Sequence, residues 1–127
     1  MTDMAALLPE ALIRVNEAGA DAQTLDFAPL TADGRCGVEM HQLYGPQETG
    51  EGGPAAGVVR YRPGARTQAH RHGGFEIIYV LDGHLQTDAG DHQAGSLLCM
   101  EPGSVHAPRS DGGALLLVIW EQAVHLV

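Results

Sequence analysis

Two histidines separated by a single residue, His70 and His72, are the part of this sequence best suited to chemistry. On a β-strand, residues i and i+2 point to the same face, so both imidazoles would project to one side. Glu76 follows after a Gly-Gly pair, and its carboxylate can fold back beside them. His106, in a turn-rich segment, supplies a fourth candidate. Three imidazoles and one carboxylate suit Zn(II), Fe(II), Ni(II), Mn(II) or Cu(II).

We expect these four residues to bind one divalent metal ion per chain, with Fe(II) or Zn(II) favoured. An ion that accepts five or six ligands then keeps one or two positions for water or substrate, and can activate water, polarise a carbonyl or bind dioxygen. The alternative is four ordinary polar residues near a turn. We expect the remaining histidines at the surface: His41, His84, His92 and His125.

Short strands and turns must position these ligands. Apolar and β-branched runs predict strands over residues 23–30, 38–44, 56–62, 77–81, 84–89, 94–100 and 115–120. A turn is expected at Asp82-Gly83, where the fourth strand ends. Residues 45–54 contain no hydrophobic side chain and predict a solvent loop, which is either a tolerated surface segment or a lid.

The N-terminal region carries apolar residues at helical spacing, at Leu8, Ala11, Leu12 and Val15. We therefore predict a short helix within residues 4–18. The 17 glycines, 7 prolines and 5% aromatic residues favour a turn-rich all-β domain with an aliphatic core. Residues 1–127 are expected to form one domain, with an N-terminal arm over 1–22 and a β-barrel over 23–127.

The spacing of the first ligands resembles the first sequence motif of the cupins. The motif is matched without a departure at Gly64, His70, His72, Glu76 and Gly83. Five residues separate Gly64 from His70, three separate His72 from Glu76, and six separate Glu76 from Gly83.

The second cupin motif is looser here. Gly95, Gly103 and His106 stand where the pattern expects them. Glu101 occupies the usual proline position, and Ser110 replaces the common asparagine. Both departures fall at turn and scaffold positions rather than at ligands.

The amino-acid sequences of segments 60–65 and 101–110 are most similar to those of cupins related to the C-terminal domain of the anti-sigma factor ChrR. The resemblance implies a cupin double-stranded β-helix, a jelly-roll barrel, holding a metal ion. Small cupins include dioxygenases, isomerases and lyases, whereas the ChrR domain responds to a reactive molecule and controls a partner. This chain shows no separate N-terminal domain with zinc ligands, so its length does not support a sigma-factor partner.

The residues around the metal site are less well defined by the sequence. Tyr61 points opposite to Arg60 and Arg62 on a strand, and either face could be the inner one. An inward arginine could hold a substrate carboxylate, and outward arginines would line a solvated face. Candidate pocket residues are Arg60, Tyr61, Gln68, Met100 and Trp120.

The formal charge of −9, with seven arginines and no lysine, argues against nucleic acid and anionic membranes as partners. No secretory signal and no run of eighteen apolar residues are visible, so a cytoplasmic setting is expected. Cys36 and Cys99 lack metal-ligand spacing and are interpreted as strand or core thiols. The apolar end of the chain, residues 115–120 and 123–127, predicts a homodimer or a seal over the barrel.

Two classes of function compete. The ligand set and its open positions favour a metalloenzyme acting on a small molecule, most plausibly a non-haem Fe(II) dioxygenase, with a metal-assisted lyase or isomerase as a variant. The alternative is a ChrR-like metal-dependent ligand-binding or stress-sensing module without turnover.

Overall fold

The computed structural model describes residues 12–127, and most of these residues lie in β-strands. The elements in chain order are β1 (Leu12–Asn16), β2 (Gly19–Gln23), β3 (Ala28–Pro29), the 3-10 helix η2 (Ala32–Gly34), β4 (Cys36–Tyr44), α1 (Pro46–Thr49), β5 (Ala55–Arg66), β6 (His70–His72), β7 (Glu76–Thr87), β8 (Gly90–Gln93), β9 (Leu97–Met100), β10 (Val105–His106), β11 (Arg109–Ser110), β12 (Ala114–Trp120) and β13 (Val124–Leu126).

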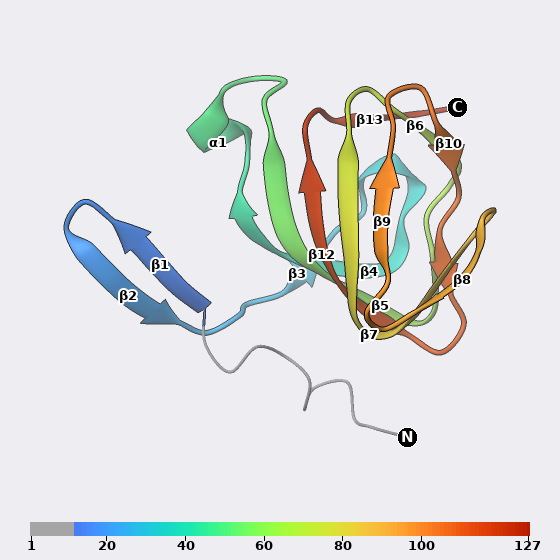
Figure 1. The fold of residues 1–127 in the computed structure, drawn as a ribbon, viewed down its shortest axis with the longest axis horizontal. Helices are drawn as coiled ribbons and strands as arrows, with labels where there is room; N and C mark the ends of the chain where they lie inside the picture. Colours follow the sequence, from blue (N-terminus) through green and yellow to red (C-terminus); the bar gives the residue numbers. More distant parts are fainter. Residues whose placement is uncertain (1–11) are drawn as a thin grey trace.

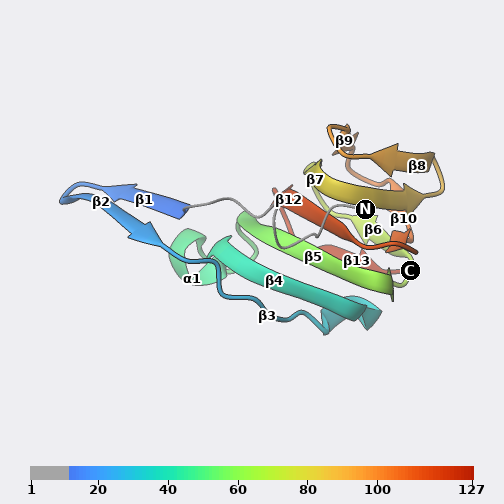
Figure 2. The same cartoon turned by 90° about the horizontal axis from the view of Figure 1, so that it is seen from below.

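A large antiparallel sheet forms the body of the fold, in the order β11-β7-β12-β5-β4-β3, with β8 and β9 also pairing with β7. Because β11 pairs with both β7 and β5, the sheet closes on itself. A small sheet, β10-β6-β13, lies at one end of this barrel (Figure 1). The view from below shows β4, β5, β12 and β7 as successive strands of one curved layer (Figure 2). The predicted all-β cupin barrel is confirmed.

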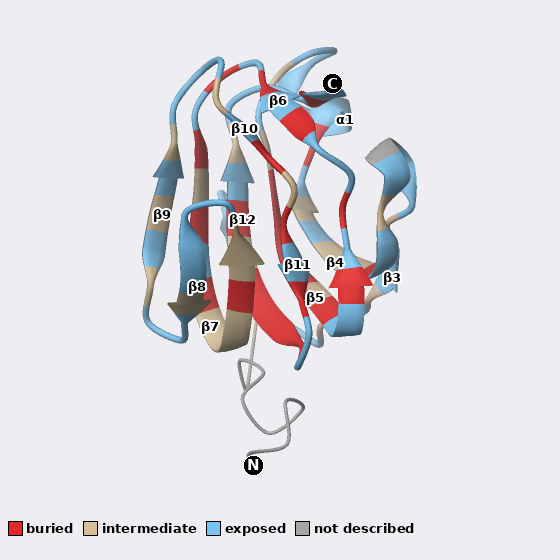
Figure 3. Cartoon of the chain, turned by 90° about the vertical axis from the view of Figure 1, so that its right-hand side faces the viewer, coloured by how far each residue is buried: buried red, intermediate tan, exposed pale blue. Residues whose placement is uncertain are grey.

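Strand β12 lies at the centre of the large sheet, between β7 and β5. Its sequence is an unbroken apolar run, and Leu115 and Leu116, which point to opposite faces, are both buried. A strand buried on both faces needs such a run. The core cluster uses alternate residues of the neighbouring strands, including Val59, Ile78 and Val80. Figure 3 shows these buried stretches lining the inside of the barrel. Each large aliphatic side chain buried there contributes roughly 1.5–3 kcal/mol.

The predicted N-terminal helix is wrong for the described residues. Residues 12–18 belong to the β1–β2 hairpin, which extends away from the barrel (Figure 1), and the expectation for residues 4–11 lies outside the described residues. The turn explains the difference: Asn16 Oδ1 accepts a hydrogen bond from the Ala18 amide at 2.9 Å, and Gly19 follows with a φ of 136°. An asparagine that bonds to the backbone two residues on favours a turn over a helix.

The predicted turn at Asp82-Gly83 is also wrong, because β7 continues to Thr87. Val80 pairs with Leu116 and Asp82 pairs with Leu115, so Leu81 is one extra residue on β7. The structure therefore has a β-bulge at this place, and Gly83 has a φ of +70°. Turn-type residues inside a strand often mark such bulges.

The other predicted strands agree more closely with the structure. Strands β4, β5 and β12 cover the predicted segments, whereas the stretch 23–30 is strand only at its two ends. The predicted loop 45–54 is mostly exposed and contains the single turn of α1. Cys36 and Cys99 lie on β4 and β9, where both are free and exposed rather than in the core. Between residues 12 and 127, no helix is long and apolar enough to cross a membrane.

Candidate metal centre

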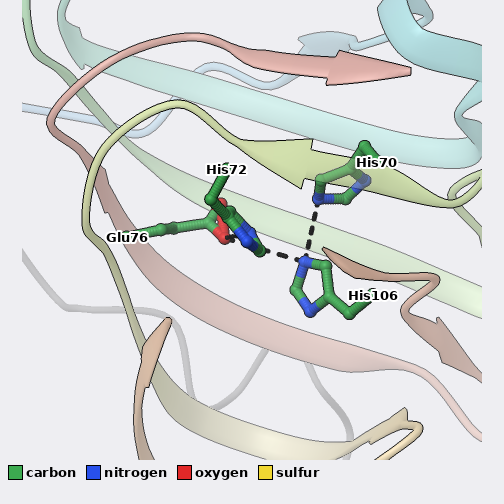
Figure 4. Close-up of side chains that lie close together, drawn as sticks. All are labelled: His70, His72, Glu76 and His106. Carbon is green, nitrogen blue, oxygen red and sulfur yellow. Dashed lines mark hydrogen bonds and ion pairs between the residues drawn. The ribbon is translucent and has the colours of Figure 1, made fainter. Parts of the chain in front are cut away.

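The four predicted ligands lie together at the end of the barrel that carries the small sheet. One candidate ligand atom from each residue lies within 4.8 Å of the other three, and all four residues are buried. Figure 4 shows the three imidazoles and the carboxylate pointing toward a common centre. His70 and His72 come from β6, Glu76 begins β7, and His106 ends β10.

Strand pairing explains why residues so far apart in the sequence meet. His106 pairs directly with His70 across β10 and β6, in an antiparallel register. On the other side of β6, strand β13 pairs Val124 with His72 and Leu126 with His70. The C-terminal tail therefore fixes the strand that carries two of the ligands.

The distances between candidate ligand atoms fit a bound ion. His72 Nε2 lies 2.8 Å from Glu76 Oε2, and His106 Nε2 lies 2.8 Å from His70 Nε2. Two adjacent ligands that each bond to a metal at about 2.05 Å at right angles lie about 2.9 Å apart. The rings of His70 and His106 are nearly perpendicular, at 83°, so their nitrogens converge without the rings stacking.

The opposite ring nitrogens are held by main-chain carbonyls. His70 Nδ1 donates to Gln68 O at 3.1 Å, and His72 Nδ1 donates to Ser104 O at 3.0 Å. Ser104 Oγ lies 2.9 Å from the same His72 nitrogen and itself donates to Glu101 O. A proton fixed on Nδ1 leaves Nε2 as the metal-binding nitrogen, which is the usual arrangement around protein-bound metals.

Local charges separate the three imidazoles in their affinity for protons. Burial lowers the pKa of His70 below its usual value. Burial, together with the charges of His70 and His72, lowers the pKa of His106 to about 3. Burial alone would also lower the pKa of His72, but the hydrogen bond and negative charge of Glu76 outweigh it and raise that pKa. His70 and His106 are therefore neutral and ready to bind a cation at neutral pH.

These pKa directions predict that a single proton competes with the metal. Below its raised pKa, His72 holds a proton on Nε2 and cannot bind, so metal affinity falls as the pH falls through that value. We expect the logarithm of the zinc affinity to change by about one unit per pH unit once the pH is below the raised pKa of His72. Competition titrations with a chromophoric chelator measure this slope, and a slope near three would contradict the assignment.

The sequence matches the family described as ChrR Cupin-like domain over residues 15–124. This protein belongs to that family. No curated protein sequence matches the chain.

Solved structures similar to this cupin include two dioxygenases. A putative acetylacetone dioxygenase from Methylibium petroleiphilum has a TM-score of 0.72 at 15% identity, over 81% of this chain and 75% of that chain. An acetylacetone dioxygenase from Acinetobacter johnsonii has a TM-score of 0.72 at 12% identity, over 94% of this chain and 78% of that chain. The anti-sigma factor ChrR in complex with SigE, from Rhodobacter sphaeroides, has a TM-score of 0.61 at 20% identity, over 76% of this chain and 49% of that chain. At these identities the likeness shows the fold.

The cupin barrel has a small inner cavity of about 20 Å³ beside the ligands. Three of the four candidate ligands line it, together with Tyr61 and Trp120 from the predicted pocket set. The cavity has room for about one water molecule. Tyr61 is buried and shares a 2.7 Å hydrogen bond with Thr67, and burial raises its pKa to about 12. Its phenol is therefore neutral at physiological pH.

Two other predicted pocket residues lie near the site without lining the inner cavity. Met100 pairs with Glu76 across β9 and β7 and faces a separate groove that His106 also lines. Gln68 touches the site through its main-chain oxygen, and its side chain packs against Gly34.

Arg60, also predicted as a pocket residue, does not line the inner cavity. Tyr61 takes the inner face of β5, so Arg60 and Arg62 point outward, and both form ion pairs with Glu39. Arg60 Nη2 lies 3.0 Å from Glu39 Oε2, and the guanidinium also lies over the Phe27 ring at 4.3 Å. The alternation of side chains along a strand allowed only one of these faces to be internal.

Sequence reasoning missed Arg35, which lines the inner cavity together with His70, Glu76 and His106. It directly follows η2, and no spacing relates it to the cupin motifs. The predicted surface histidines stay outside the metal cluster: His41, His84, His92 and His125.

Proposed function

We propose that this cupin is a mononuclear non-haem Fe(II) dioxygenase that acts on a small organic substrate. The observation that carries the proposal is the buried set of three imidazoles and one carboxylate, whose atoms converge within 4.8 Å. Four protein ligands leave one or two positions on a five- or six-coordinate iron for substrate and dioxygen. The likeness in fold to two acetylacetone dioxygenases supports the same reaction class.

The residues of this chain would hold and shield the reacting centre. Iron, when bound, supplies the redox chemistry that dioxygen requires. Glu76 lowers the net charge at the ion, and the carbonyls of Gln68 and Ser104 fix the orientation of His70 and His72. Ile78, on the same face of β7 as Glu76, contributes an apolar wall to the inner cavity.

Oxygen uptake tests this proposal directly. Protein loaded anaerobically with one equivalent of Fe(II) is mixed with air-saturated buffer and acetylacetone, a catechol or a small thiol, while an oxygen electrode records consumption. We expect substrate-dependent uptake with at least one member of this panel, and the same protein loaded with zinc should give none.

A lack of uptake across the panel, with iron content at one per chain before and after the assay, would contradict the dioxygenase proposal. The Glu39→Gln variant is a suitable control, because Glu39 pairs with the outward arginines and lies outside the metal cluster. Its uptake should match that of the parent protein.

A metal-dependent sensing module is the second candidate. The family match and the small inner cavity favour it, since a space for about one water admits a small reactive molecule more readily than an organic substrate. Pull-down from the native host would then retain a protein partner, whereas an empty pull-down would count against sensing. Tightly held zinc with no oxygen uptake would instead favour a sensor or a redox-silent lyase or isomerase. A cytoplasmic location and a homodimer stay predictions from the sequence.

A further inference from the structure

Arg35 lies at the junction between the inner cavity and a larger groove on the outside of the barrel. Three residues, Leu30, Arg35 and Trp120, line both spaces. The outer groove has a volume of about 370 Å³, against about 20 Å³ for the inner cavity. These shared residues mark a passage from this groove toward the inner cavity, which three of the candidate metal ligands line.

The chemistry of the outer groove is apolar with one positive charge. Its walls come from the η2 turn, the start of β5, and the segment that joins β12 to β13. Among the described residues that line the groove, Arg35 is the one that carries a charge, and the others are Leu30, Ala32, Met40, Pro46, Gly53, Ala55, Trp120, Ala123 and Val124. This groove fits an apolar chain attached to an anionic group.

The position of Arg35 is fixed by its surroundings. Its Nη1 donates a hydrogen bond to Ala32 O at 2.9 Å, across the turn of η2. Gly34 precedes it with a φ of +67°, and a Cβ there would lie 2.4 Å from the side chain of Gln68. Gln68 in turn holds His70 through its carbonyl oxygen. The turn that presents Arg35 is thus packed directly against the residue that orients a metal ligand.

The positive charge of Arg35 reaches the metal centre. Arg35 lines the inner cavity together with His70, Glu76 and His106. A guanidinium in the wall of this cavity favours an anion beside these residues.

A second groove, of about 450 Å³, borders the site on the side of His106. Two carboxylates, Asp88 and Glu101, line it, and none of the described residues in its walls is an arginine. This groove therefore repels anions, and the two approaches to the centre differ in the sign of their charge.

We propose that small organic anions, carboxylates or enolates with a short apolar chain, reach the metal centre through the groove between η2 and β13, and that Arg35 binds their anionic group. Arg35 is thus the residue that determines specificity for charge. The inference rests on the proposed function in taking the metal centre as the place where the ligand acts, but it concerns binding and requires no turnover.

Trp120 offers a direct readout, because it lines the passage and is the single tryptophan of the chain. Zinc-loaded protein is titrated with hexanoate and with its neutral isostere hexanamide, and tryptophan fluorescence is recorded. We expect saturable binding of hexanoate, at least about tenfold tighter than that of hexanamide, because a charge-assisted bidentate pair is lost with the amide. Zinc carries no redox chemistry, so this result is independent of whether the iron protein is a dioxygenase.

Substitution of the arginine separates its role from that of the metal. Arg35→Met should remove the preference for hexanoate over hexanamide, and Arg35→Lys should retain part of it. Arg62→Met removes the same charge from the outer face and should leave the preference intact. Zinc content and thermal unfolding are measured for each variant. Equal affinities of the parent protein and Arg35→Met for hexanoate would overturn the proposal, as would the lack of a saturable response in the parent.

The route is tested with a matched pair of exposed alanines. Ala123→Phe narrows the groove beside Arg35, and Ala89→Phe narrows the acidic groove beside His106. We expect Ala123→Phe to weaken hexanoate binding and Ala89→Phe to leave it unchanged. The reverse pattern would place the entry on the acidic side and overturn the proposed route, even if Arg35→Met itself failed to fold.

Discussion

His72→Ala should leave the protein without stoichiometric metal. The side chain is buried, its Nε2 faces Glu76 Oε2 at 2.8 Å, and its Nδ1 is fixed by the Ser104 carbonyl. Among the described residues, the cluster holds three other candidate ligands, His70, Glu76 and His106, and no spare one. Removal of a residue that only orients a ligand typically costs 10–100-fold in affinity, and loss of the ligand itself should exceed about 100-fold. Elemental analysis after extensive dialysis measures the result.

The stability of the protein should change in parallel. A metal present at about 1,000 times its Kd stabilises the folded state by about 4 kcal/mol, which for a chain of this length is an increase in Tm of more than about 10 °C. His72→Ala should lose this increase. His125→Ala removes an exposed imidazole outside the cluster and should keep it. Unchanged metal content in His72→Ala would refute the ligand assignment.

Gly83→Ala should be the most damaging of the backbone substitutions. Gly83 has a φ of +70°, and a Cβ there would lie only 2.1 Å from the carbonyl oxygen of Gly113. A left-handed conformation costs a non-glycine residue about 1–2 kcal/mol, and the clash with rigid backbone adds an overpacking cost of about 1–3 kcal/mol. We therefore expect a loss of about 3 kcal/mol or more in the free energy of unfolding, measured by urea denaturation.

Gly64→Ala is the matched control for the clash between the added Cβ and the backbone. Gly64 also belongs to the first cupin motif and has a φ of +84°, but a Cβ there would meet nothing within 4 Å. Its substitution should cost only the backbone strain, about 1–2 kcal/mol. Equal losses for Gly83→Ala and Gly64→Ala would show that the close approach to Gly113 has no energetic consequence.

The grouping of three of the four candidate ligands, His70, His72 and Glu76, was predictable from the sequence for a physical reason. Side-chain alternation along a strand sets the common face of His70 and His72, and the Gly-Gly break allows Glu76 to return beside them. His106 could be placed only by analogy with the cupins, because its pairing with His70 depends on a register between distant strands. Alternation also separated Tyr61 from Arg60, but it could not say which of the two faces inward.

Other features of the fold depended on tertiary structure. The helical spacing of apolar residues near the N-terminus was overridden by the asparagine turn after Asn16, whose hydrogen bond no periodicity reveals. The local sequence Asp82-Gly83 resembles a turn. The bulge before Gly83 could not be predicted from it, because the bulge arises from the pairing of β7 with β12. Arg35 lies far from the motifs in sequence and joins the site only because η2 packs against Gln68 and β13.

X-ray absorption spectroscopy at the metal edge of protein loaded with one equivalent of zinc or iron tests the central claim most directly. The account predicts a first shell of nitrogen and oxygen atoms at about 2.0–2.2 Å, with outer-shell scattering from three imidazoles. Cys36 and Cys99 are the competing ligands, because both are free and exposed. A sulfur scatterer at about 2.3 Å, or fewer than two imidazoles, would contradict a centre built from His70, His72, Glu76 and His106.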